Sequence, residues 1–468
     1  MRLFRIAPST MTPTPQSDGG RFYRLAWRWH FYAGLFVAPL LLMLSLTGIV
    51  YLFKPQLDAA MYRDLMFVAP AVRTVSAEAQ LAAVRAAYPD ARVVKFAPPP
   101  AADRASEVRL DSARAGKLTV FVDPYRNRVL GARDDERNLQ TIALKLHGEL
   151  LLGRAGDFVI EMATSWGLLL IASGVYLWWP RGQRHGVFRP RLTAKKRVFW
   201  RELHAVGGFW SLGLIGFLML SGMPWTGFWG AQFAGVWNTY PAPLFREIPK
   251  SGLPAAALNS TSDKTVPWAV ETTPLPASSD HHGHAGHDAG RTRPALSLDA
   301  VVAIARARGL PAGYSVALPR GATGVYTVSA NTDDPREQVT LHIDQYSGRV
   351  LSDIRWADYG AVARTVEVGI ALHEGKLFGL ANQLVMLFAC LAAILLTVSG
   401  VVMWWKRRPA GRLGAPTTPD GQPIWRTGVA FLAVAGLLFP AVGVSTLAVL
   451  AFDRLLLARL PPLARALR

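Results

Sequence analysis

The sequence is poor in cysteine and has no recognisable nucleotide-binding motif. Its 468 residues include one cysteine, Cys390, so an intrachain disulfide cannot form and a disulfide-built fold is excluded. No Gly-rich phosphate loop, dinucleotide fingerprint or nucleophile triad stands out in it. We therefore expect no flavin or nucleotide domain within this sequence.

Long apolar runs, in contrast, are abundant, and 51% of the residues are hydrophobic. Runs of about 20 apolar residues have the length of helices that cross a bilayer. Candidate spans lie at 31–53, 158–179, 206–228, 383–405 and 429–452. The polar segment before the first run is long and shows no small-residue cleavage motif, so we expect an uncleaved anchor.

Acidic residues are scarce in three short segments that border these runs. Residues 1–29, 181–201 and 406–426 hold most of the net charge of +19, and Asp18 and Asp420 are their only acids. Basic short loops mark the cytoplasmic side of a membrane, so this charge predicts topology and not nucleic-acid binding. We expect a multi-pass protein of the bacterial inner (plasma) membrane, with its N-terminus cytoplasmic and two long periplasmic loops.

Two halves of the chain share a pattern of histidines and glycines. His30 and His204 each precede a glycine by 18 residues, whereas His147 and His373 each precede one by 27. In the long loops, FVDPYRNRVLG at 121–131 corresponds to HIDQYSGRVLS at 342–352. These correspondences predict an internally duplicated chain, as in many membrane proteins.

We therefore predict an α-helical integral membrane protein with two α+β modules in its periplasmic loops, four core spans and one C-terminal span. Each module shows a helical period followed by alternating strands and turns. The predicted segments are a basic cytoplasmic leader (1–29), a first span (30–54), a first module (55–140), an amphipathic His segment (141–157), a second span (158–180), a basic cytoplasmic loop (181–201), a third span (202–228), a second module (229–370) with a flexible His-rich insertion (251–294), a second amphipathic His segment (371–382), a fourth span (383–405), a cytoplasmic loop (406–426), a fifth span (427–452) and a C-terminal tail (453–468).

The four equivalent histidines are candidate ligands of haem b. The predicted topology places His30 with His204 at the cytoplasmic face and His147 with His373 at the outer face, about 30 Å apart. Imidazoles from two helices fill both axial positions of a haem iron and leave it a carrier of single electrons. We expect two such haems, without covalent attachment because the sequence has no CxxCH motif.

Two other interpretations of these histidines stay open. Each could be an interfacial residue without a ligand, although ionisable residues near membrane depth are functional candidates by default. They could instead bind zinc together with Glu149 or Glu374, but two histidines per face underfill a tetrahedral site.

The surroundings of the histidines resemble the motifs of the PepSY-associated transmembrane family. The similar motifs are Leu146-His147-Gly148, Leu372-His373-Glu374, Leu203-His204, Trp29-His30 and the span endings GVYLWWPR and GVVMWWKRR. The two loop segments resemble PepSY domains, and the resemblance covers roughly residues 22–408. It implies an iron-regulated, siderophore-reductase-like oxidoreductase of the inner membrane, which reduces a periplasmic ferric siderophore and releases Fe(II). Because no flavin or nucleotide domain is expected, quinol or a cytoplasmic reductase would donate the electrons.

A histidine-rich tract, DHHGHAGHD at 280–288, lies in the second long loop. It contains His281, His282, His284 and His287, a composition that binds Cu, Ni or Zn, and a solvated low-complexity segment is the alternative. The tract leaves open a periplasmic metal-handling protein as the function. A PepSY-type regulatory or binding module anchored by its spans is a further alternative, although it has no use for paired histidines.

Overall fold

The computed structural model describes residues 18–180, 187–194, 197–237, 242–260, 262, 264–278, 294–409, 414, 426–452, 455 and 459. Within them, four helices are long and apolar enough to cross a membrane. They are α1 (Asp18–Leu52), α6 (Arg154–Trp178), α7 (Arg197–Gly222) and α12 (Leu380–Trp405). They match the first four predicted spans, and the protein is a membrane protein.

The chain divides into two compact units, which are described separately. Unit 1 comprises Met1–Pro39, Ser165–Leu212 and Leu395–Arg468, and unit 2 comprises Leu40–Thr164 and Gly213–Ile394. Unit 1 holds parts of the four long helices together with α13 (Arg426–Leu438) and α14 (Pro440–Phe452). Unit 2 holds the sheet and the remaining helices.

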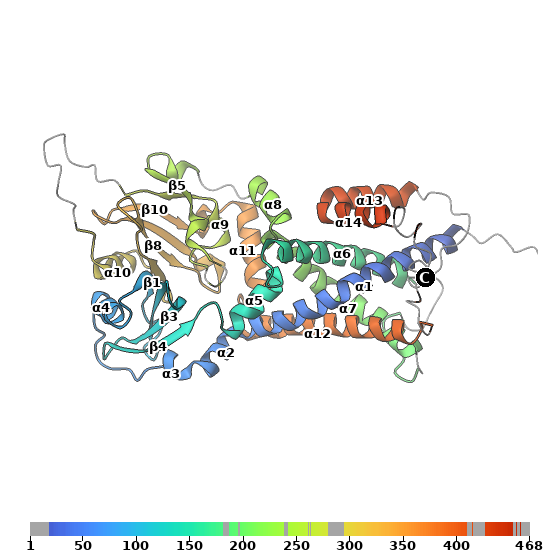
Figure 1. The fold of residues 1–468 in the computed structure, drawn as a ribbon, viewed down its shortest axis with the longest axis horizontal. Helices are drawn as coiled ribbons and strands as arrows, with labels where there is room; N and C mark the ends of the chain where they lie inside the picture. The colour runs from blue at the N-terminus through green and yellow to red at the C-terminus, as the bar shows by residue number, and fades with distance from the viewer. Residues whose placement is uncertain are drawn as a thin grey trace, which may run out of the picture. The chain divides into compact units, whose positions relative to one another are not determined.

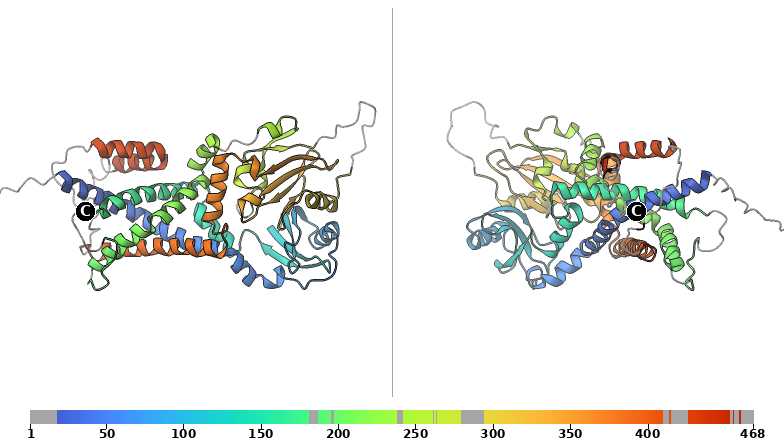
Figure 2. Two further views of the ribbon diagram at one scale, coloured as in Figure 1. Left: turned by 180° about the vertical axis from the view of Figure 1, so that it is seen from behind. Right: turned by 45° about the vertical axis from the view of Figure 1, so that its right-hand side comes forward.

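The predicted fifth span over 427–452 is wrong, because this segment forms a hairpin of two short helices. Both α13 and α14 have 13 residues, and Figures 1 and 2 show them side by side. Pro440 lacks a backbone N–H and disfavours helical geometry at the residue before it, so the helix breaks at Phe439. A β-carbon on Gly436 would lie 3.0 Å from Cα of Gly443, so the two glycines allow this close crossing.

One antiparallel eight-stranded sheet dominates unit 2, with the order β10-β9-β8-β7-β1-β2-β3-β4. Its strands are β1 (Ala91–Ala97), β2 (Ser106–Ser112), β3 (Gly116–Asp123), β4 (Arg128–Asp134), β7 (Ser315–Ala317), β8 (Val325–Ala330), β9 (Val339–Asp344) and β10 (Val350–Arg355). The strands of the two predicted modules join where β1 pairs with β7, Lys95 opposite Ala317 and Phe96 opposite Val316. The two modules therefore share a single sheet.

Helices α4 (Ala77–Ala87) and α10 (Leu298–Ala307) cover one face of this sheet (Figure 1). Their apolar residues join the alternate strand residues of both modules in one hydrophobic core, which includes Leu81, Val301 and Leu341. Ser76 and Ser297 cap the two helices as their position predicts. An acid from each helix also caps the other, because Asp299 accepts from Ala77 N (2.7 Å) and Glu78 accepts from Leu298 N (3.1 Å).

The prediction of a flexible insertion over 251–294 is wrong for the described residues between 251 and 278. They form β5 (Lys250–Pro254), α9 (Trp268–Glu271) and β6 (Pro274–Pro276), with β5 paired to β6. Val266 and Val270 are fully buried in a second hydrophobic cluster with Trp268. Because the segment is rich in Ser, Pro and Ala, its composition does not reveal these few apolar residues. Their burial is sufficient to order the segment.

The shorter helices of unit 2 connect the sheet with the long helices. They are α2 (Lys54–Met61), α3 (Arg63–Met66), α5 (Leu139–Glu149), α8 (Trp229–Trp237) and α11 (Ala361–His373). Two of them, α5 and α11, carry a candidate histidine in their last turn, as the predicted amphipathic segments require.

Candidate functional site

The first histidine pair lies in unit 1, where His30 of α1 and His204 of α7 face each other. Their ring centroids are 6.5 Å apart and their planes are perpendicular. Two metal–nitrogen bonds of about 2 Å each, added to the two ring radii, account for a separation of this size. The residues present thus fit a metal ion held between two imidazoles.

A serine hydroxyl from a neighbouring helix contacts Nδ1 of each of these rings. Ser173 Oγ of α6 lies 2.9 Å from Nδ1 of His30, and Ser399 Oγ of α12 lies 3.0 Å from Nδ1 of His204. The carbonyl oxygen of Leu396 also lies 3.0 Å from the His204 nitrogen. Each ring is therefore oriented through Nδ1, on the side opposite its Nε2.

A glycine follows each serine and lets the imidazole lie against the helix backbone. A β-carbon on Gly174 would stand 3.4 Å from Cε1 of His30, and one on Gly400 would stand 3.5 Å from Cε1 of His204. These separations are ordinary van der Waals contacts, so any atom beyond a β-carbon toward the ring would displace it.

The second pair, in unit 2, is held in the same way. Thr47 Oγ1 lies 3.0 Å from Nδ1 of His147, and Ser221 Oγ lies 2.8 Å from Nδ1 of His373. The next residues, Gly48 and Gly222, would each place a β-carbon 3.6 Å from Cε1 of the corresponding ring. Nδ1 of each of the four histidines thus contacts the hydroxyl of a Ser or Thr residue, and a glycine follows that residue in the sequence.

The hydroxyl contacts assign the proton of each ring to Nδ1. Each hydroxyl donates its own hydrogen to a backbone carbonyl three or four residues earlier on its helix. It therefore accepts from Nδ1–H, which leaves the lone pair of a neutral imidazole on Nε2. Within the described part of the chain, no protein group is bonded to Nε2 in any of the four rings. This is the tautomer that binds a metal through Nε2.

Burial and the neighbouring charge of His373 lower the pKa of His147 to about 4. Burial also lowers the pKa of His373. Both rings are therefore neutral at physiological pH, as a metal ligand must be. The Trp225 ring stands edge-on to His373, with 5.9 Å between the centroids.

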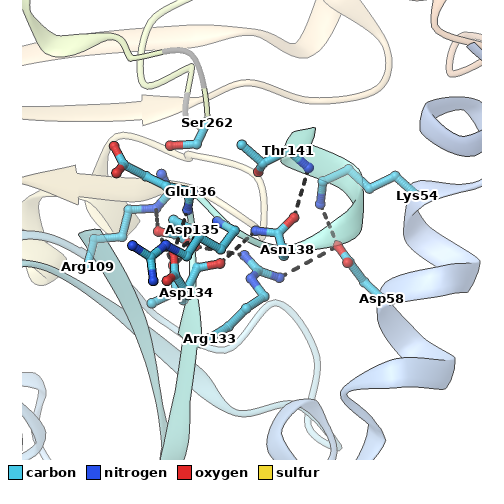
Figure 3. A network of polar contacts seen from close by, with 12 residues as sticks. Lys54, Asp58, Arg109, Arg133, Asp134, Asp135, Glu136, Asn138, Thr141 and Ser262 are labelled. Atoms are coloured by element: carbon cyan, nitrogen blue, oxygen red, sulfur yellow. Dashed lines mark hydrogen bonds and ion pairs between the residues drawn. The ribbon is translucent and has the colours of Figure 1, made fainter. Parts of the chain in front are cut away.

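A buried polar network fixes the start of α5, the helix that carries His147 (Figure 3). Asn138 Oδ1 accepts from Thr141 N (2.8 Å) as the N-cap, while its Nδ2 donates to the Asp134 carbonyl (2.9 Å). Arg133, which precedes this segment on β4, lies 3.6 Å from the carboxylate of Asp58 on α2, and both side chains are at most 10% exposed. The network joins β4 and α2 to the start of α5, the helix that carries His147.

The acids proposed as zinc partners do not complete a metal site. Glu374 Oε2 lies 2.5 Å from Lys376 Nζ, so it is already engaged in an ion pair. Among the described residues, no three His, Cys, Asp or Glu side chains gather in a position to hold a metal ion. His281, His282, His284 and His287 lie outside the described residues.

The hydroxyl–glycine pairs were missed from the sequence, although a signal for them was present. Thr47-Gly48, Ser173-Gly174, Ser221-Gly222 and Ser399-Gly400 stand at the repeated glycines whose spacing from the histidines defined the two halves. Small residues in apolar helices are also typical of close helix packing, and spacing alone does not say which ring they contact.

Comparison with known families identifies the family of this chain. Residues 27–407 match the family described as the PepSY-associated TM region, and these residues include all four histidines. The chain belongs to the PepSY-associated transmembrane family. No curated protein matches the sequence. The four apolar helices of this chain are long enough to cross a membrane, which indicates association with membrane lipid.

Proposed function

We propose that this protein binds two haem b groups through His30/His204 and His147/His373 and carries electrons across the membrane. The observation that supports this most is the repeated ligand environment, in which four neutral imidazoles each have Nδ1 bonded to a hydroxyl and Nε2 without a protein partner. Each histidine pair would hold one haem through its two imidazoles, and a haem held in this way would supply one-electron transfer.

The residues of the chain serve this chemistry by positioning and by shielding. Hydrogen bonds from Nδ1–H increase the basicity of Nε2 and fix the ring orientation. The glycines give a flat helix surface beside each ring, and the apolar helices exclude water, which lowers the local dielectric. No side chain described in the structure needs to exchange a proton for the electron to pass.

The charge pattern supports the direction of this transfer. We infer that the N-terminus is cytoplasmic and that the sheet of unit 2 is periplasmic, in a bacterial inner membrane, because Lys and Arg concentrate in the short segments around 1–29, 181–201 and 406–426. The first pair is then the entry side, supplied by quinol or a cytoplasmic reductase. We also infer an internal duplication, since each half repeats a long helix, strands, a short His helix and a second long helix.

The acceptor that we propose is a ferric siderophore, and the reaction is the reduction of its Fe(III) to Fe(II). One electron passes from the chain to the chelated iron, and the chelator atoms are unchanged. Fe(II) is held less tightly than Fe(III) by hard oxygen donors, so reduction releases the iron for uptake. This makes the protein a haem-dependent oxidoreductase.

A visible spectrum tests the cofactor. The purified full chain is expected to show a Soret band with sharp α and β bands after dithionite, and pyridine haemochrome analysis should give about two haems per chain. His30→Ala and His147→Ala should each remove one of the two haems. A colourless protein that stays colourless with added haem would overturn the proposal.

The acceptor requires a separate measurement. Protein reduced by dithionite under anaerobic conditions should be reoxidised when a ferric siderophore is added, while a gallium-loaded siderophore, which cannot be reduced, leaves the bands unchanged. Deletion of residues 278–290 should leave this reoxidation intact. If the deletion abolishes it, the histidine-rich tract handles the metal and the metal-handling alternative gains support.

A further inference from the structure

Among the residues of unit 1 that the structure describes, Arg24, Arg197 and Arg407 form no ion pair with a carboxylate. Its described residues include one acid with a described side chain, Glu202, which lies 3% exposed. Arg191 already binds Glu202 through its backbone N (2.9 Å) and its Nε (3.0 Å), and Arg201 lies 3.8 Å from it. Arg24, Arg197 and Arg407 are not among the partners of Glu202.

Arg24, Arg197 and Arg407 lie on the same side of the first histidine pair. Arg24 precedes His30 by six residues on α1, and Arg197 precedes His204 by seven on α7. At 1.5 Å per residue, these arginines stand about 9–10 Å along the helix axes from the imidazoles. Arg407 follows the end of the antiparallel α12, seven residues after Gly400, which contacts His204.

Ring contacts place the guanidinium group of Arg407 beside α1. The Cζ atom of Arg407 lies 4.4 Å from the ring centroid of Trp27 and 5.3 Å from that of Phe31, both on α1. Trp27 is one helical turn from Arg24, so α1 presents both residues to the same region. Burial, and to a lesser extent the charge of Arg197, lower the pKa of Arg407.

An unpaired buried donor points to a missing acceptor. Nε of Arg24 is buried, and no described residue accepts a hydrogen bond from it. Burying such a donor without an acceptor is costly, and bringing like charges together adds to the cost. An anion with planar oxygens relieves both costs, because guanidinium forks match carboxylate geometry.

We propose that Arg24, Arg197 and Arg407 form a carboxylate-binding site that holds the propionate groups of the haem at His30 and His204. This inference rests on the proposed function. It adds an orientation for the haem of the first pair, because the propionate edge would face the N-terminal ends of α1 and α7. The two bound carboxylates would supply negative charge next to these arginines, where Glu202 is the one acid whose side chain the structure describes in this unit.

The test compares haem with haem dimethyl ester, in which both propionates are neutral. The full chain carrying His147→Ala and His373→Ala offers only the first pair, and its apoprotein in phosphatidylcholine nanodiscs is titrated with each porphyrin by Soret absorbance. Haem is expected to bind about 10-fold more tightly than the ester, because charge-assisted pairs are lost in the ester. Arg24→Gln and Arg407→Gln should bring this ratio close to one by weakening haem binding alone.

Two further variants test whether the positive charge at Arg407, and not any nearby arginine, causes the preference for haem. Arg407→Lys keeps the positive charge and should keep most of the preference for haem. Arg408→Gln is the matched control, because its guanidinium lies over the Trp405 ring, 3.6 Å from the centroid, and should leave the ratio unchanged. Equal affinities for haem and ester in the parent protein would overturn the inference, as would an equal effect of Arg408→Gln.

The remaining outcomes are distinguishable. If the ester and haem both bind with a Soret shift but without preference, the histidine ligation stands and the carboxylate site is refuted. If neither porphyrin binds, the proposed function fails together with this inference. If the arginine variants lose only co-purified anionic lipid and keep the preference for haem, the arginines hold a lipid phosphate and the inference is overturned.

Discussion

Ser173 Oγ stands 2.9 Å from Nδ1 of His30 and donates its own hydrogen to the Leu170 carbonyl at 3.1 Å. This relationship fixes which nitrogen of His30 carries the proton, and it recurs at the other three histidines with different hydroxyl residues. The helix that carries each hydroxyl also carries the glycine beside the ring. Orientation and space for the imidazole therefore come from the same two residues.

Ser173→Ala is expected to raise the reduction potential of the haem at the first pair. Without the acceptor at Nδ1–H, the imidazole donates less electron density to iron and stabilises the ferric state less. Haem affinity should fall about 10-fold as the ring loses its fixed orientation. A spectroelectrochemical titration measures the potential, and Ser173→Thr, which keeps the hydroxyl, serves as the control. Identical potentials in Ser173→Ala and the parent protein would contradict this role.

Gly222→Val is expected to expel haem from the second pair while Gly222→Ala retains it. A β-carbon at this position fits at 3.6 Å from Cε1 of His373, but the γ-methyl groups of valine require the space that the ring occupies. The haem content should fall from about two per chain to about one in the valine variant. Pyridine haemochrome analysis of both purified variants measures this. Full haem content in Gly222→Val would show that the glycine does not set the position of the ring.

Arg133→Met is expected to destabilise unit 2 by about 2 kcal/mol, because it removes the buried cation shared by Asp58 and Asp135 and leaves these carboxylates only Lys54 and Arg109 as ion-pair partners. Adding Asp58→Asn should recover part of the loss, since one of the two carboxylates that lose Arg133 is then neutral. Thermal unfolding followed by circular dichroism measures both variants. Arg92→Gln is the control, because its ion pair with Asp111 is about half exposed and contributes less than about 1 kcal/mol.

Cysteines placed at Arg426 and Phe452, in a background with Cys390→Ala, should react with a membrane-impermeant maleimide from the same side of the membrane. The close contact of Gly436 with Gly443 makes α13 and α14 a hairpin, so its two ends come together. Labelling of intact spheroplasts and of inverted vesicles measures the side. Reaction from opposite sides would show that residues 426–452 cross the membrane once and would contradict the hairpin.

The sequence predicted the four long helices and the proximity of His30 to His204, because apolar run length and repeated spacing survive in the primary structure. The ligand role of these histidines stays a prediction. The hairpin at α13 and α14 was missed because hydropathy over 24 residues outweighed the helix-breaking effect of Pro440. The ordered segment around Trp268 was missed because composition does not reveal which few apolar residues find a core.

The positions of the hydroxyl residues were visible in the sequence, but their contact with the imidazole nitrogens was not, for a different physical reason. A serine in an apolar helix can donate its hydroxyl hydrogen to a carbonyl three or four residues earlier in any helix position. The sequence therefore does not show that the same hydroxyl oxygen also accepts a hydrogen bond from an imidazole nitrogen. The joining of β1 with β7 was equally hidden, since β7 has only three residues and pairs with β1 at two positions.

The crossed capping of α4 and α10 has a consequence for any attempt to divide the protein. A fragment ending before residue 297 would lack Asp299 at the first turn of α4, and a fragment starting after it would lack Glu78 at the first turn of α10. Each fragment would also present β1 or β7 as a bare strand edge, a template for intermolecular pairing. We therefore expect the two halves to depend on each other for folding, and each half to aggregate when it is expressed alone.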